Sequence, residues 1–127
     1  MTVTTTLLVG LSGALGAAAR FVLDGLVRSR WPTTIPLATM LINISGAFLL
    51  GLLTGLWMAA EVATGWRDVL GVGFLGGYTT FSTAMVETVH LRQHHHAGLA
   101  AANLLIMIAA CGFAAFLGLG FGAPARF

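Results

Sequence analysis

The sequence predicts an all-α membrane protein with four transmembrane helices. Of its 127 residues 57% are hydrophobic and only 8% are charged, whereas soluble domains carry about 25% charged residues. Its uncharged stretches are long enough to cross a bilayer, since a spanning helix needs about 20 apolar residues. Trp31, Trp57 and Trp66 fall near the ends of these stretches, where indole rings favour the membrane interface. We therefore predict a single multi-pass domain over residues 1–127, surrounded by lipid in the cell membrane.

The positions of the charged residues set the predicted helix boundaries. Residues 2–19 carry no charge and apolar character resumes at Phe21, which predicts a first helix over residues 4–27. The uncharged or nearly uncharged stretches that follow predict helices over residues 35–59, 68–92 and 99–122. The connections are short, so consecutive helices are expected to cross the membrane in opposite directions.

All six basic residues are arginines, and they are nearly balanced between the two sides of the predicted bundle. Arg28, Arg30 and Arg92 fall on one side, and Arg67 and Arg126 on the other. Because the Lys and Arg bias sets orientation, near balance permits insertion both ways and so an antiparallel dimer. The scattered arginines form no nucleic-acid-binding surface, and no nucleic-acid partner is expected.

The sequence shows no sign of catalytic chemistry. No serine has an obvious membrane-embedded histidine and acid as partners, and no phosphate-binding loop is present. The single cysteine, Cys111, lies in an apolar run, where a packing role is usual. The run His94–His96 suits a closed metal site poorly and is predicted to be a solvated loop. We predict that the protein is not an enzyme.

Small residues recur on one face of the second predicted helix. Every fourth position there is small or carries an amide: Thr39, Asn43, Ala47, Gly51 and Gly55. The fourth predicted helix also carries small residues at helical spacing, Gly118 and Gly122, and so does the first, at Gly10, Gly13 and Gly16. In membranes such faces allow helix backbones to approach closely. They predict tight helix pairs and an oligomer.

Polar residues within the predicted spans are candidates for function because they are costly in hydrocarbon. Asn43 can either join helices through a hydrogen bond or donate an amide N–H in a pore. Arg20 precedes Asp24 by one helical turn, so it either pairs with Asp24 or attracts anions to a vestibule. Glu87 is expected to cap nearby hydroxyls or to pair with an arginine.

The segment over residues 71–83 is predicted to break the third helix at mid-membrane. Gly76 and Gly77 are followed by Tyr78, Thr79 and Thr80, a combination unfavourable to a continuous helix. Unpaired backbone at this depth is tolerated only where it is buried in protein or faces a cavity or an ion. Carbonyl groups aimed at one point suit a cation, and amides suit an anion. The alternative is a kink satisfied by Thr and Ser hydroxyls.

Three motifs resemble the Fluc/CrcB fluoride channels and together cover nearly the whole chain. They are Gly13-Ala-Leu-Gly16 with Arg20, Asn43-Ile-Ser-Gly46, and Gly76-Gly-Tyr-Thr-Thr-Phe-Ser-Thr83 with Glu87. The resemblance implies an antiparallel dimer with a structural sodium ion held by the backbone carbonyls of Gly76 and Thr79. It also implies passive export of fluoride from the cytoplasm along a pathway formed by Asn43, Phe81, Thr80, Ser82 and Thr83.

The chain departs from the family pattern at several positions that are expected to line the pathway. A second phenylalanine is replaced by Ala84, and the fourth-helix tyrosine by Asn103, followed on the same face by Met107, Cys111 and Ala115. The partner is therefore either an identical chain or a related four-helix subunit, in which case this chain is a half-pore or non-conducting subunit. A small multidrug transporter is a weaker alternative, because the first predicted helix lacks a glutamate.

Overall fold

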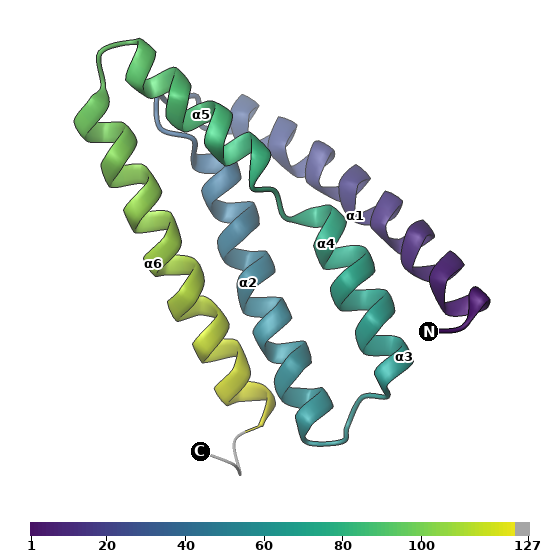
Figure 1. Ribbon diagram of the computed structural model, residues 1–127. Helices are drawn as coiled ribbons and strands as arrows, with labels where there is room; N and C mark the ends of the chain where they lie inside the picture. Colours follow the sequence, from purple (N-terminus) through teal and green to yellow (C-terminus); the bar gives the residue numbers. More distant parts are fainter. Residues whose placement is uncertain (124–127) are drawn as a thin grey trace.

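The computed structural model describes residues 1–123, which form a bundle of long helices (Figure 1). Helix α1 is Val3–Arg30, α2 is Leu37–Met58 and α6 is Ala97–Gly122. The third crossing contains four elements, α3 (Thr64–Arg67), the π-helix η1 (Asp68–Leu75), α4 (Gly76–Tyr78) and α5 (Ser82–Gln93). Within these residues, four helical stretches are long and apolar enough to span a membrane. The prediction of four spans is confirmed, while Arg126 lies outside the described residues.

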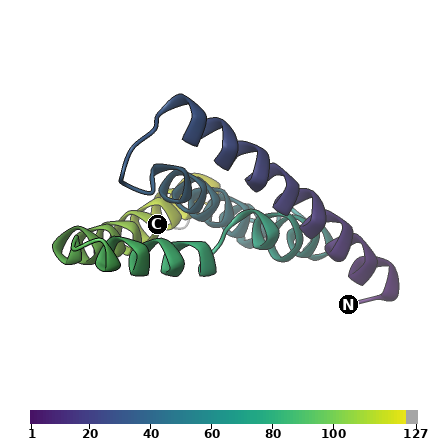
Figure 2. The same ribbon diagram turned by 90° about the horizontal axis from the view of Figure 1, so that it is seen from above.

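The helices are arranged around α2. In Figure 1, α6 lies along one side of α2, and α1 and the first half of the third crossing lie on the other. Figure 2 shows from above that α1 runs along the first half of the third crossing, whereas α5 lies beside α6. The two halves of the third crossing therefore pack against different neighbours, and the chain changes neighbours where the helix is interrupted.

Glycines allow α2 and α6 to touch through their backbones, as their spacing predicted. A Cβ atom on Gly118 would collide with the backbone of Phe48 and Leu52 in α2. A Cβ atom on Gly51 would likewise collide with the backbone of Ala115 in α6. Apolar burial drives little association between helices in lipid, so such close contact is a principal source of stability there.

Glycines also allow α1 to pack closely against the first half of the third crossing. A Cβ atom on Gly16 would collide with the carbonyl of Phe74, and one on Gly77 with the carbonyl of Gly13. Ser12, on the same face of α1, donates its hydroxyl to the carbonyls of Val9 and Val69, at 3.0 and 2.7 Å. By contrast, a Cβ atom on Gly10 would meet nothing within 4 Å, so this glycine is not needed for the contact.

The outer surface of the bundle is apolar. Large hydrophobic side chains on α1 and α6 are more than half exposed, among them Leu11, Phe21, Phe113 and Phe121. A soluble protein rarely exposes so continuous an apolar surface, whereas lipid covers it without cost. The chain is accordingly a multi-pass protein of the cell membrane.

The third helix is broken within the predicted segment, directly after the turn that contains its two glycines. Gly76 and Gly77 remain helical, and Gly77 makes a close contact with α1. The chain leaves the helix at Thr79, whose φ of −81° and ψ of 159° are extended, and re-enters it at Ser82. The interruption therefore consists of residues 79–81.

Substitution of Gly118 tests the contact between α2 and α6. Gly118→Ala should lower the free energy of unfolding by about 1–3 kcal/mol, because the new methyl group overpacks a backbone contact. Gly120→Ala is the matched control on the same helix, since a Cβ atom there meets nothing within 4 Å. Both can be measured by denaturation with sodium dodecyl sulfate in mixed micelles. Equal stability of the two variants would contradict the role assigned to Gly118.

Candidate functional site

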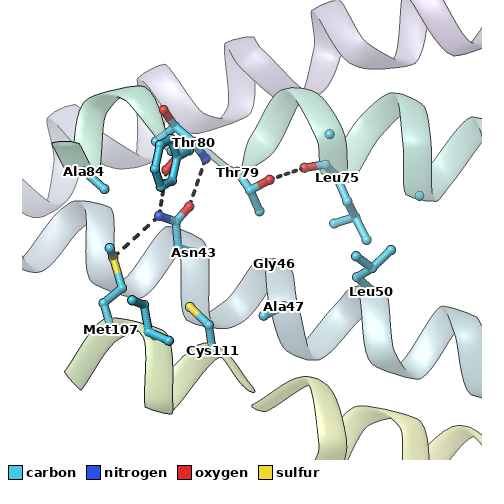
Figure 3. Close-up of a pocket in the computed structure, with 14 residues that line it drawn as sticks. Asn43, Gly46, Ala47, Leu50, Leu75, Thr79, Thr80, Ala84, Met107 and Cys111 are labelled. Atoms are coloured by element: carbon cyan, nitrogen blue, oxygen red, sulfur yellow. Dashed lines mark hydrogen bonds between the residues drawn. The ribbon is translucent and has the colours of Figure 1, made fainter. Parts of the chain in front are cut away.

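The interruption of the third helix is held by the side chain of Asn43 on α2 (Figure 3). Asn43 Nδ2 donates to the Thr80 carbonyl at 2.8 Å, and the Thr80 N–H donates to Asn43 Oδ1 at 2.9 Å. One side-chain amide thus satisfies both backbone groups of a residue that has left the helix. The interpretation of Asn43 as a link between helices is confirmed, and its partner is backbone rather than a side chain.

Each end of the interruption presents a different backbone group. The Leu75 carbonyl accepts from the Thr79 N–H and from the Thr79 hydroxyl, each at 2.9 Å. Because the Thr80 N–H is drawn to Asn43, it does not bond the Gly76 carbonyl, and no N–H or hydroxyl of residues 1–123 donates to the carbonyl of Gly76 or Thr79. Acceptors without donors remain where α4 ends, and the N-terminus of α5 follows directly.

Thr80 also caps the start of α5. Its Oγ1 accepts from the Thr83 N–H at 3.2 Å and lies 3.1 Å from the Thr83 hydroxyl and 3.3 Å from that of Ser82. Hydroxyl groups therefore satisfy backbone at the start of α5, as expected for a kink satisfied by Thr and Ser hydroxyls. They do not reach the carbonyl groups at the end of α4, so hydroxyl capping explains only one side of the break.

A cavity of about 390 Å³ opens beside the break, between the third crossing, α2 and α6. Figure 3 shows Asn43 and Thr80 at one end of this cavity, with the sulfur atoms of Met107 and Cys111 facing it from α6. Asn43 Nδ2 lies 3.7 Å from Met107 Sδ. The wall is largely apolar and includes Phe81, whose side chain is 76% exposed in the single chain.

A second cavity of about 310 Å³ lies on the other side of the break, toward α1. Its polar lining comes from three elements and consists of Arg20, Asp24, Thr39, Thr80 and Thr83. Among the predicted pathway residues, all of which the structure describes, only Thr80 lines both cavities. The predicted pathway residues are therefore divided, with Asn43 and Phe81 on one side of the break and Thr83 on the other, while Ser82 is exposed.

The expected pairing of Arg20 with Asp24 is wrong. Asp24 pairs with Arg28 instead, with 2.8 Å between its Oδ2 and Arg28 Nε. Asp24 lies one helical turn from both Arg20 and Arg28, so it could reach either. Arg28 is the one held in place by a second carboxylate, that of Glu87. Arg20 Nε is buried without a hydrogen-bond partner, so Arg20 offers an unused donor beside the second cavity.

Glu87 pairs with an arginine, which was one of the two roles expected for it. Its Oε1 accepts from Arg28 Nη2 at 2.5 Å and from the Thr39 hydroxyl at 2.9 Å. Arg28 and Thr39 lie 59 and 48 residues away in sequence. No local sequence pattern links Glu87 to either residue, because the three positions lie so far apart along the chain.

Asn103 differs from Asn43 although both are amides within a spanning helix. Asn103 is only 4% exposed, and its Oδ1 is buried without a partner. It therefore contributes no hydrogen bond that holds the bundle together.

Together the fold and the break define a class of protein. A multi-pass helical bundle with an interrupted mid-membrane helix, free carbonyls and a cavity on each side of the break is an architecture of ion channels and transporters. The family model described as CrcB-like protein, Camphor Resistance (CrcB), matches residues 7–119. The chain belongs to this family of fluoride-specific ion channels, which is not a family of enzymes.

Curated relatives cover nearly the whole chain. The Fluoride-specific ion channel FluC 1 of Leifsonia xyli subsp. xyli is 46% identical over 122 residues, which is 93% of this chain and 89% of the relative. FluC 3 of Bifidobacterium longum is 42% identical over 119 residues, 89% of this chain and 98% of the relative. FluC 1 of Listeria monocytogenes is 42% identical over 123 residues, which is 91% of this chain and 95% of the relative. These relatives remove the multidrug-transporter alternative.

The contrast between the two asparagines gives a stability test. Asn43→Ala should lower the free energy of unfolding by about 2–4 kcal/mol, because it leaves the N–H and the carbonyl of Thr80 without partners. Asn103→Leu removes an amide whose oxygen has no partner and should be neutral or stabilising. Denaturation in mixed micelles measures both. If Asn43→Ala proved as stable as the unmodified protein, Asn43 would not be holding the break.

Proposed function

We propose that the chain forms a fluoride-selective channel that lets fluoride leave the cytoplasm passively, down its electrochemical gradient. The observation that carries the proposal is the interrupted third helix held open by Asn43, in a chain that belongs to the fluoride channel family. An interrupted helix offers a small ion backbone dipoles in place of its water, without a fixed charge that would trap it.

Hydrogen-bond donors for fluoride are present on both sides of the break. An amide nitrogen carries two N–H groups, and Asn43 uses only one on Thr80, leaving the other near Met107 Sδ, a weak acceptor. The exposed Phe81 ring can offer its electropositive edge to an anion. Across the break, the free Nε of Arg20 and the hydroxyls of Thr80 and Thr83 supply a polar vestibule. Ser82 adds an exposed hydroxyl at the start of α5.

We also propose that the carbonyls of Gly76 and Thr79 hold a structural sodium ion at the centre of a dimer. These carbonyls fit the role, because they accept no hydrogen bond from residues 1–123 and carbonyl oxygen is a ligand suited to hard cations. Gly76 is exposed in the single chain, so a second copy in the opposite orientation can approach this face. The sodium ion would neutralise the carbonyl dipoles and fix the two broken helices against each other.

A second candidate function is that of one subunit in a channel of two unlike chains. The observation in its favour is the cavity wall on α6, where Met107 and Cys111 supply sulfur rather than hydroxyl groups, with Ala84 opposite. A pathway with so few donors replaces the hydration of fluoride poorly. In a channel of two unlike chains, one of the two pathways would then no longer conduct fluoride.

Efflux from liposomes that contain only this chain tests the proposal and separates the two candidates. We expect fluoride efflux, read by a fluoride electrode, with no chloride efflux. Phe81→Ile should abolish flux in at least one pathway, whereas Phe113→Ile, on the lipid-exposed face of α6, should leave it unchanged.

The possible outcomes of this efflux assay separate the proposals. No efflux from folded dimers would contradict the homodimeric channel and leave the mixed channel, to be tested by adding the related subunit. Equal flux through Phe81→Ile and the unmodified protein would contradict the role of Phe81. Chloride efflux as large as fluoride efflux would contradict selectivity.

Sodium removal tests the structural ion. Dialysis into potassium salts should reduce fluoride flux at least tenfold, because the carbonyls at the break lose the cation that holds them, and returning sodium should restore it. The same dialysis should leave the helical content measured by circular dichroism unchanged. Full flux after exhaustive exchange would contradict the proposed sodium site.

A further inference from the structure

Two histidines at the end of α5 lie in the geometry of a metal chelate. His90 and His94 are separated by one helical turn, and the helical hydrogen bond from the His94 N–H to the His90 carbonyl, at 3.1 Å, keeps both on one face. The centres of their rings are 5.5 Å apart, with an angle of 78° between the ring planes. Both side chains are exposed, so both are accessible from water.

This ring separation is the one that a shared ion requires. An ion bonded to imidazole nitrogen at about 2.1 Å lies about 3.2 Å from the ring centre, so two rings at a tetrahedral angle have centres about 5.3 Å apart. Spacings of three to five residues between histidines are common in protein metal sites.

The surroundings of the pair favour a cation. His90 and His94 line a cavity of about 530 Å³ together with Arg28, Glu87 and other residues of the connecting loops. Arg28 is paired with both Asp24 and Glu87, so this charge cluster carries one net negative charge. Glu87 Oε2 is buried and accepts no hydrogen bond. Because two carboxylates offset Arg28, its positive charge does not repel a cation from the two histidines.

We propose that His90 and His94 bind a divalent transition-metal ion of the copper, nickel and zinc class. Imidazole suits these ions, and copper(II) binds most tightly among them. Residues 1–123 contain no group of three or more His, Cys, Asp or Glu side chains able to hold a metal ion. The two imidazoles are therefore the whole protein contribution, water fills the other positions, and the site is open and exchangeable. This proposal stands apart from fluoride conduction.

His95 supplies a matched control within the histidine run. Its φ of 63° turns the chain out of the helix, and it does not line the cavity that holds its neighbours. Asparagine tolerates such a φ, so His95→Asn removes an imidazole without straining the backbone. His90→Ala and His94→Ala change exposed positions, and thermal unfolding can verify that both variants remain folded.

The experiment is a calorimetric titration of copper(II) into the detergent-solubilised full chain prepared without an affinity tag. We expect one ion per chain with micromolar affinity, and an electron paramagnetic resonance spectrum showing two nitrogen ligands. His90→Ala or His94→Ala should weaken binding at least tenfold, while His95→Asn should bind as tightly as the unmodified protein. No binding below millimolar copper would overturn the proposal. Weakening by His95→Asn equal to that by His94→Ala would also overturn it, since the consecutive run would then be the ligand.

Discussion

The structure depends on one constraint, namely that backbone exposed by a broken helix must find partners inside a membrane. At residues 79–81 the chain gives up its helical hydrogen bonds where no water is at hand to replace them. Asn43 meets this demand by bonding both the N–H and the carbonyl of Thr80. By taking the Thr80 N–H, the same side chain leaves the Gly76 carbonyl free. The side chain that stabilises the break therefore also leaves free a carbonyl at which we propose a sodium ion.

Close contacts between helix backbones make this arrangement possible. Gly77 and Gly16 bring the first half of the third crossing against α1, while Gly51 and Gly118 bring α2 against α6. The second half of the crossing, α5, packs beside α6 instead. Since its two halves have different neighbours, the third crossing must be interrupted between them. The cavities on either side of the break follow from this change of neighbours.

Arg28, Asp24 and Glu87 form a cluster of ion pairs at one end of the bundle, while Arg67 and Asp68 pair at the other. Arg28 joins Asp24 on its own helix to Glu87 on α5, and Glu87 also accepts from Thr39 on α2. Three helices are thus tied together at the end where His90 and His94 also lie. Arg20, one turn before Asp24, forms no ion pair with a carboxylate of residues 1–123.

The four spans, the interruption of the third and the small-residue faces could be predicted from the sequence, because hydrophobic length, glycine spacing and motif order are local properties of the chain. The sequence also identified Asn43 and the carbonyl-bearing segment as important. Which groups meet depends on how the helices pack. The packing places the break at residues 79–81, within the predicted segment, and uses Gly77 in the preceding helix for close contact with α1. It paired Asp24 with Arg28 rather than Arg20 and brought Glu87 to both Arg28 and Thr39, because partners distant in sequence are selected by how the helices pack.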